Sequence, residues 1–121
     1  MRTVTLSAVV LSVLAGSALA QVYPVEGRFG ESASSEKGTI DCAGKRVIEF
    51  RGDQRTDSNG GVPAYRNQSV TSQGASSYRV VDEFSTGQIN GQVSYALRKI
   101  DPDHIEMNMQ DGGSVKLQRC R

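Results

Sequence analysis

The C-terminal third of the chain alternates apolar and polar residues with the period of a β-strand. Residues 105–110 read Ile-Glu-Met-Asn-Met-Gln, and residues 114–119 return as Ser-Val-Lys-Leu-Gln-Arg. Asp-Gly-Gly at 111–113 supplies the glycines of a hairpin turn. Residues 92–98 alternate in the same way, and Asp-Pro-Asp at 101–103 fits a type I turn. The pattern predicts a meander of three antiparallel strands with one buried face.

The preceding region predicts further strands with less regular alternation. Residues 21–121 contain nine Val and five Ile against two Leu, and side chains branched at Cβ favour a pleated sheet. Residues 53–64 show no periodicity, so we expect a mobile loop there. The additional strands are expected at residues 25–29, 38–42, 46–50, 68–72 and 78–85. About eight strands in so short a chain predict an all-β fold, a small antiparallel meander barrel.

The first twenty residues have the composition of a cleavable signal peptide. Arg2 precedes an apolar stretch over residues 4–14, and Ala18 and Ala20 are the small residues that signal peptidase requires. The apolar stretch is shorter than the roughly 20 residues of a membrane-spanning helix. We therefore expect cleavage after Ala20, a single β domain over residues 21–121, a periplasmic or secreted location and no membrane insertion after cleavage.

The charge balance argues against one class of partner. Without Arg2, the chain carries 13 basic and 13 acidic residues, and the two kinds are interleaved. A domain with no net charge lacks the positive field that attracts nucleic acid or an anionic membrane. We predict no nucleic-acid partner.

The two cysteines, Cys42 and Cys120, are expected to form a disulfide because an exported chain folds in an oxidising compartment. The bond would constrain a long loop of the unfolded chain and stabilise a small domain substantially. A redox or metal site is the alternative. The chain offers neither a Cys-x-x-Cys spacing nor more than one histidine to support it.

Residues that could carry catalysis are few and scattered. His104 is the only histidine, and it follows the predicted turn, where a solvated side chain is expected. Asp82 and Glu83 are adjacent, so on a strand they point to opposite faces and cannot act as a pair. The sequence has no nucleophile elbow, no zinc-protease helix and no cofactor motif. We predict a protein that is not an enzyme and binds no cofactor or metal.

Two polar segments, residues 53–64 and 73–78, are the candidate interaction loops. Tyrosines with neighbouring arginines, as found near both segments, are common in binding surfaces. The candidate contact residues are Asp57, Asn59 and Tyr65 for the first segment and Ser76, Ser77 and Tyr78 for the second.

Two functions fit these observations. The leading hypothesis is a non-enzymatic binding or interaction module whose barrel mouth or exposed loop holds a small apolar ligand or a protein partner. The alternative is an inhibitor of an enzyme that attacks the cell envelope, such as a lysozyme or a protease, which requires a rigid protruding loop. A chain this short is expected to fill its interior with side chains, which favours recognition at the surface.

As a whole, the chain resembles a group of small exported proteins of alphaproteobacteria, especially of rhizobia and their relatives. The resemblance rests on Tyr-Pro-Val-Glu-Gly-Arg-Phe-Gly at 23–30, Ile-Asp-Cys-Ala-Gly-Lys-Arg-Val-Ile at 40–48 and Tyr-Arg-Val-Val-Asp-Glu-Phe at 78–84. It continues at 100–107 and 115–120. The group implies export and carries no activity to transfer.

Two further resemblances concern architecture. Gly27-Arg28-Phe29 and Arg119 are similar to the opening Gly-x-Trp strand and the closing arginine of lipocalin-like, or calycin, barrels. That likeness implies a barrel-closing pair of Phe29 and Arg119, with Phe29 in place of the tryptophan. The positions of the two cysteines, and Gly-Ala-Ser-Ser-Tyr at 74–78, resemble periplasmic lysozyme inhibitors of the single-disulfide barrel type. Fold-level likeness of this kind does not carry function.

Overall fold

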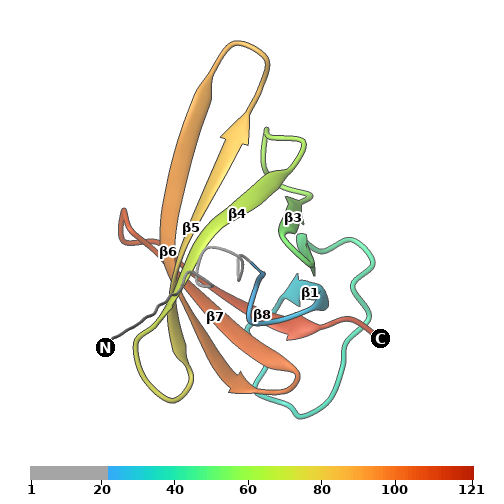
Figure 1. The fold of residues 1–121 in the computed structure, drawn as a ribbon. Coiled ribbons are helices and arrows are strands. Elements are labelled where there is room, and N and C mark those ends of the chain that lie inside the picture. Colours follow the sequence, from blue (N-terminus) through green and yellow to red (C-terminus); the bar gives the residue numbers. More distant parts are fainter. Residues whose placement is uncertain (1–21) are drawn as a thin grey trace, which may run out of the picture.

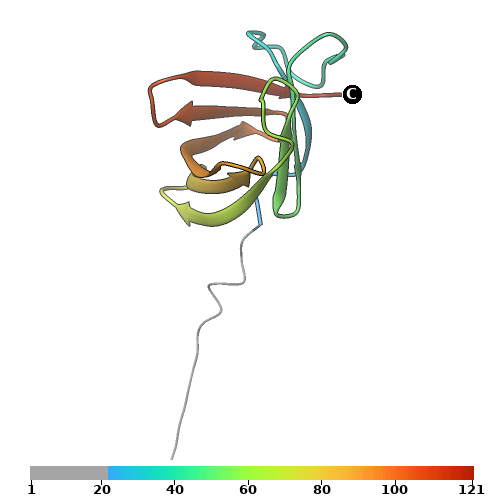
Figure 2. The same ribbon diagram turned by 90° about the horizontal axis from the view of Figure 1, so that it is seen from above.

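The structure is a computed structural model that describes residues 22–121, and the predicted signal peptide lies outside this range. The described chain forms a closed barrel in which each strand pairs antiparallel with the next and β1 pairs with β8 (Figure 1). The strands are β1 (Gly27–Glu31), β2 (Val47–Arg51), β3 (Gln54–Asp57), β4 (Tyr65–Ser72), β5 (Ser77–Ser85), β6 (Asn90–Asp101), β7 (His104–Met109) and β8 (Ser114–Arg119). The predicted all-β antiparallel barrel is confirmed. Its strand order can be followed around the wall in Figure 2.

The predicted C-terminal meander is present as β6, β7 and β8. Its register pairs Leu97 with Met107 and Met107 with Val115, so the alternating apolar residues share the inner face. Gly112, in the turn after β7, has φ of +104°, which is the conformation that a glycine supplies there. Strict alternation and turn chemistry therefore located these strands correctly.

Two of the predictions for the first half are wrong. β3 lies inside residues 53–64, which were expected to be a mobile loop, and it pairs with both β2 and β4. Its inward positions are charged, because Arg55 and Asp57 are buried while Gln54 and Thr56 face outward. Without apolar residues on its inner face, the strand has no hydrophobic alternation to detect.

Residues 38–42, which were expected to form a strand, make a single bridge instead. Ile40 lies parallel to Cys120, and its amide donates to the Arg119 carbonyl at 2.9 Å. Gly38 has φ of +91°, and the Ala43 amide donates to Asp41 Oδ1 at 3.0 Å. A left-handed residue on one side and a side-chain turn on the other leave no room for a longer strand.

The predicted disulfide is confirmed. It joins Cys42, before β2, to Cys120, after β8, across 78 positions of sequence with Cα atoms 5.5 Å apart. The bond passes close to β1, since a Cβ on Gly30 would lie 2.6 Å from Cys42 Sγ. The absence of a side chain at position 30 is what lets the disulfide pack against the barrel wall.

Side chains fill the apolar part of the barrel interior. Tyr23, from the segment before β1, packs edge-on against Phe50 at 5.1 Å, and Phe50 packs edge-on against Phe29 at 6.1 Å. The buried apolar core consists of Tyr23, Phe29, Ile48, Phe50, Val80, Tyr95, Leu97, Ile105, Met107, Val115 and Leu117. β3 and β4 contribute nothing to this core, so one sector of the wall carries polar side chains inward.

Candidate functional site

The polar sector of the barrel contains an ion pair inside the protein. Arg55 of β3 donates from Nε to Asp82 Oδ2 of β5 at 2.8 Å, and their side chains are 3% and 0% exposed. Asp82 also accepts hydrogen bonds from the Tyr95 hydroxyl at 2.9 Å and from Asn67 Nδ2 at 3.3 Å. These contacts connect β3, β4, β5 and β6. The pair therefore fixes the side of the barrel that the apolar core does not reach.

The electrostatics of this cluster keep its tyrosines protonated. Burial raises the pKa of Tyr95 well above its usual value, and Asp82 raises it further against the opposing effect of Arg55. Burial and the Asp82 carboxylate likewise raise the pKa of Tyr23, whose hydroxyl is buried without a hydrogen-bond partner among residues 22–121. With both carboxylate oxygens of Asp82 occupied, the arrangement is suited to holding the strands together.

An aromatic pair lies against the ion pair at one end of the barrel. The Arg55 guanidinium lies 3.9 Å from the centroid of the Tyr65 ring. Tyr65 packs edge-on against Phe84 with ring centroids 5.7 Å apart. The Phe84 ring in turn covers Gly91, where an added Cβ would fall 2.7 Å from the ring. A continuous stack thus runs from the buried charge to two half-buried aromatic rings.

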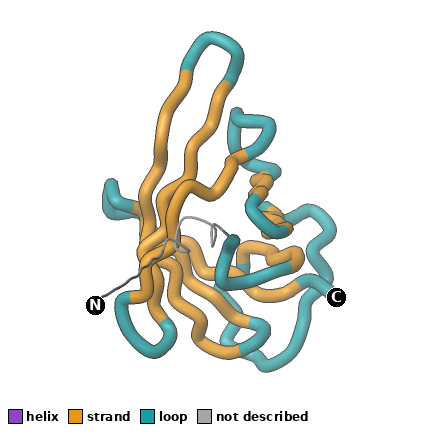
Figure 3. Tube along the Cα trace, viewed as in Figure 1, coloured by secondary structure: helices purple, strands orange, loops and turns teal. Residues whose placement is uncertain are grey.

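Beyond this stack, β5 and β6 continue past their neighbours as a two-stranded projection. β4 pairs with β5 only as far as Glu83, and β7 pairs with β6 only from Tyr95 onward. We call residues 84–94 the arm; it is the hairpin that stands away from the barrel at the top of Figures 1 and 3. Near its tip, Ile89 is 63% exposed, and the Thr86 amide closes the turn on the Ile89 carbonyl at 2.9 Å.

A solvent-open hollow of about 630 Å³ lies where β4 meets the arm. Arg66 and Glu83 give it charges of both signs, and Tyr65 and Phe84 give it apolar surface. The complete lining is Gln54, Ala64, Tyr65, Arg66, Glu83, Phe84, Ser85, Asn90, Gly91 and Gln92. Aromatic rings beside a polar rim are typical of the surfaces with which proteins bind other proteins.

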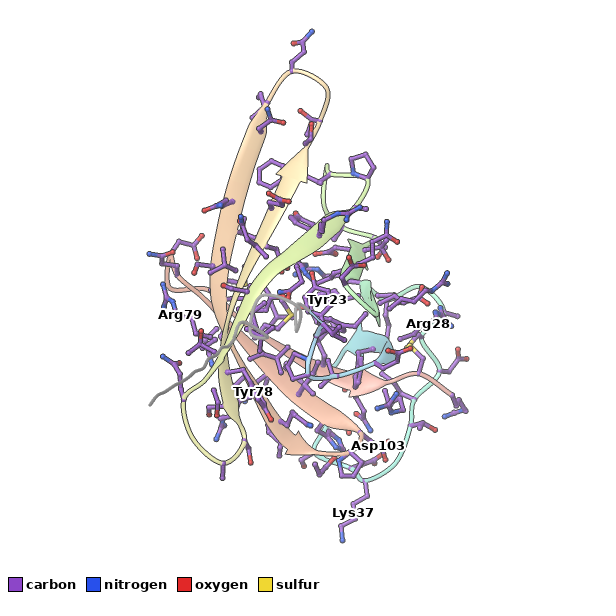
Figure 4. All side chains as sticks on the ribbon, viewed as in Figure 1. Tyr23, Arg28, Lys37, Tyr78, Arg79 and Asp103 are labelled. Carbon is purple, nitrogen blue, oxygen red and sulfur yellow. A yellow bond between two sulfur atoms is a disulfide. The ribbon has the colours of Figure 1, made fainter. Side chains whose placement is uncertain are left out.

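The candidate interaction residues do not form one surface. Tyr65 belongs to the aromatic pair, whereas Ser76, Ser77 and Tyr78 lie around the β4–β5 turn at the opposite end of the barrel (Figure 4 labels Tyr78). Asn59 is exposed in the β3–β4 connection. The site also contains residues that sequence reasoning did not select, namely Arg55, Asp82, Phe84 and Tyr95.

The expectation that Asp57 lies in an exposed loop is wrong. It is 9% exposed and accepts two hydrogen bonds from Arg46, from Nε at 3.0 Å and from Nη2 at 2.7 Å. The Asn59 amide also donates to Asp57, at 2.9 Å. Asp57 therefore anchors the end of β3 to the segment before β2 and is not available to a partner.

This ion pair predicts an acid-dependent loss of stability. Burial alone would raise the pKa of Asp57, but the hydrogen bonds from Arg46 and Asn59 outweigh it and lower the pKa. An unfolded aspartate has a pKa of about 3.9, so the stabilisation is complete above that pH and is lost as the pH falls through the lower folded pKa. Thermal unfolding between about pH 2 and pH 7 should show a decline in acid that is weaker in Asp57→Asn. Equal pH dependence of the two proteins would contradict this assignment.

Phe29 and Arg119 lie together where β1 meets β8. The Arg119 guanidinium is 4.6 Å from the centroid of the Phe29 ring and donates to the Glu26 carbonyl at 2.9 Å and the Pro102 carbonyl at 3.0 Å. Gly27 makes this placement possible, since an added Cβ would fall 2.5 Å from Arg119 Nη1. The Arg119 side chain thus links the segment before β1 to the β6–β7 turn, at the end of the barrel away from the arm.

Gly27→Ala is expected to lower the free energy of unfolding by about 1–3 kcal/mol, because alanine would be strained at φ of +113° and would displace Arg119. Gly38→Ala is the matched control. Gly38 also has a positive φ, of +91°, but no other atom of residues 22–121 comes within 4 Å of an added Cβ. Chemical denaturation should show a larger loss for Gly27→Ala; equal losses would mean that the Arg119 contact contributes nothing.

His104 is less exposed than its position after the turn led us to expect. Its side chain is 13% exposed, and Nδ1 lies 2.8 Å from Asp101 Oδ1. The hydrogen bond with His104 lowers the pKa of Asp101. His104 Nε2 is buried without a partner among residues 22–121, so no hydroxyl nucleophile is hydrogen-bonded to it in that part of the chain.

Comparison with protein-family models, with curated proteins and with solved structures gives no match. No helix within residues 22–121 has the length and hydropathy needed to cross a membrane.

Proposed function

We propose that the protein is a non-enzymatic binding module of the periplasm or the extracellular space that recognises a protein partner beside the arm. The observation that carries the proposal is the Tyr65–Phe84 pair, which borders a hollow of about 630 Å³ and rests on the buried Arg55. Aromatic side chains held by a rigid support dominate the binding energy of protein interfaces. The disulfide supports an oxidising compartment.

The contents of the barrel favour a protein partner over a small apolar ligand held inside. Eleven buried apolar residues and a buried ion pair occupy the interior. A small apolar ligand placed there would have to displace packed side chains or lie against a charge, and both are costly. The hollow beside the arm has charged and amide groups on its rim, which suits a polypeptide surface.

Site-specific photo-crosslinking tests this proposal. A photoreactive phenylalanine analogue at position 84 should give a crosslinked adduct of higher mass in the cells that make the protein. The matched control is the same analogue at position 78, since Tyr78 is also a partly buried aromatic residue of β5 but lies at the other end of the barrel. Adducts at position 78 with none at position 84 would overturn the proposed site.

The arm also favours a second candidate function, inhibition of an enzyme that attacks the cell envelope. An inhibitor needs a rigid element that enters the active-site cleft of the enzyme. Residues 53–64, the first candidate loop, contain β3 of the barrel wall. The element that projects is the arm (Figures 1 and 3). Ile89, exposed near the tip of the arm, would be the residue inserted.

Stoichiometric amounts of the purified protein should slow a lysozyme or a protease if this second function applies, and Ile89→Asp should abolish the effect. Thr71→Asp, an exposed position of β4 outside the arm, is the control. No slowing in either assay removes these enzymes from consideration.

A further inference from the structure

The β6 edge of the arm is unpaired within residues 22–121. β6 pairs with β5 from Asn90 to Arg98, but its pairing with β7 begins at Tyr95. The β6 half of the arm, Asn90 to Ser94, therefore has a neighbouring strand on one side only. The β7–β8 turn ends this gap, where the Gln110 amide donates to the Ser94 carbonyl at 3.2 Å.

The direction of the backbone groups along this edge follows from the hydrogen bonds at the two ends of the β5–β6 ladder. The Thr86 amide donates to the Ile89 carbonyl at 2.9 Å, and the Lys99 amide donates to the Ser76 carbonyl at 2.8 Å. Both bonds join an odd-numbered residue on the β6 side to an even-numbered residue on the β5 side. Pairing between these ends has no register shift, so the odd residues of β6 bond to β5 throughout.

The even-numbered residues of β6 must then point their N–H and C=O groups away from β5. Ser94 follows this rule, because its carbonyl accepts from Gln110. Asn90 and Gln92 follow it with no strand beside them in the described part of the chain. The edge consequently offers two amide donors and two carbonyl acceptors at the spacing of a strand.

This edge also lacks the usual protection against strand pairing. Its sequence, Asn-Gly-Gln-Val-Ser at 90–94, contains no charged residue and no proline, and the irregularity in β6 lies at the other end, between Lys99 and Asp101. A solvent-open hollow of about 510 Å³ runs beside it. Its lining combines Val81, Val93 and Met109 with the charged Arg79 and Asp111.

We propose that the open part of the β6 edge of the arm, Asn90 to Val93, binds an extended segment of a partner protein as an added antiparallel strand. The proposal rests on the proposed function, because it specifies how a partner engages the arm. Backbone hydrogen bonds to Asn90 and Gln92 supply the affinity, as in other complexes formed by strand addition. Large apolar side chains at alternate positions of the segment pack beside Val93 and Met109.

A second copy of the chain fits the same edge less well. Antiparallel pairing about Gly91 would bring the turn of the second arm against Gln110, which already occupies the place opposite Ser94. Pairing about Gln92 would set Asn90 of the second copy opposite Ser94, where it meets the same obstruction, and would set only Gly91 opposite Val93. A foreign strand can end before Ser94 and can place a large side chain opposite Val93, so neither restriction applies to it.

Gln92→Pro and Gln92→Ala form the matched pair of variants. Both remove the Gln92 side chain and its hydrogen bond to Gln68, but only proline removes the outward amide. Because that amide makes no bond to β5, proline is compatible with the fold at this edge. Unfolding curves of the two variants check that both are folded.

The probe is a library of linear twelve-residue peptides displayed on phage and selected on the wild-type protein. We expect selected peptides to carry apolar residues at alternate positions. A synthetic peptide of such a sequence should bind Gln92→Ala like the wild type and Gln92→Pro about tenfold or more weakly. N-methylation of one of its central amides should weaken binding to the wild type to a similar extent, and this test does not depend on how the proline variant folds.

Three outcomes would overturn the inference: no selected peptide, equal binding to both variants, or a dimer in analytical ultracentrifugation that Gln92→Pro dissociates. The last outcome would assign the edge to a second copy of the chain. Adducts from position 84 together with any of these results would leave the proposed function standing and remove only the strand addition. Edge-dependent peptide binding without adducts from position 84 would leave the strand-binding edge standing and remove the proposed site at Tyr65 and Phe84.

Discussion

Asp82→Ala is expected to lower the free energy of unfolding by about 3–5 kcal/mol. Arg55 would then lie 3% exposed inside the barrel with no carboxylate to balance its charge. The Tyr95 hydroxyl would also lose its acceptor, and Asn67 Nδ2 would lose one of its three acceptors. Urea denaturation at neutral pH measures the loss.

Two further variants separate the buried charge from a general effect of removing aspartate. Asp53→Ala breaks the exposed ion pair with Arg66, whose closest atoms are 3.6 Å apart, and should cost no more than about 1 kcal/mol. Arg55→Leu combined with Asp82→Leu should recover much of the stability that Asp82→Ala loses, because no unpaired charge remains. Equal effects of Asp82→Ala and Asp53→Ala would contradict the buried pair.

Removal of the disulfide by Cys42→Ser with Cys120→Ser is expected to cost about 4 kcal/mol. The bond closes a loop of 78 residues, so it removes many conformations from the unfolded chain. In a domain of this size, such a loss corresponds to a fall in melting temperature of roughly 15–30 °C. Calorimetry of the double variant measures it.

Reduction of the wild-type protein gives an independent test of the same bond. Unfolding in the presence of dithiothreitol should match the unfolding of the double serine variant, since both remove the cross-link. Identical melting temperatures with and without reductant would show that the disulfide contributes nothing to stability.

The parts of the fold that were predicted from sequence are those where one face of a strand is apolar. β7 and β8 alternate strictly and are joined by a glycine-containing turn, so their positions follow from the pattern. β3 breaks the rule, because its inward residues are Arg55 and Asp57. A charged strand inside a barrel cannot be told from a polar loop until its partners are known. The disulfide was predicted from composition and compartment, without knowledge of the fold.

Most of the candidate site could not be predicted from the sequence, because its inward residues are polar and give no hydrophobic alternation. Tyr65 was selected by its neighbouring arginine, but the support beneath it comes from a residue ten positions away on another strand. The prediction that Asp82 and Glu83 point to opposite faces of their strand is confirmed. Only the three-dimensional structure shows that Asp82 contacts Arg55. The alternation of Val80, Asp82 and Phe84 along β5 was the available signal for an inward carboxylate. The arm has no such signal, because it is defined by where β4 and β7 end.

Native mass spectrometry most directly decides whether the barrel recognises partners at its surface or carries a small molecule inside. The protein would be produced with its full sequence in a bacterium and purified from the periplasm without denaturation. We predict one species with the mass of residues 21–121 less two hydrogens and with no small molecule bound. A species that retains a bound small molecule would contradict the filled interior and identify the protein as a carrier.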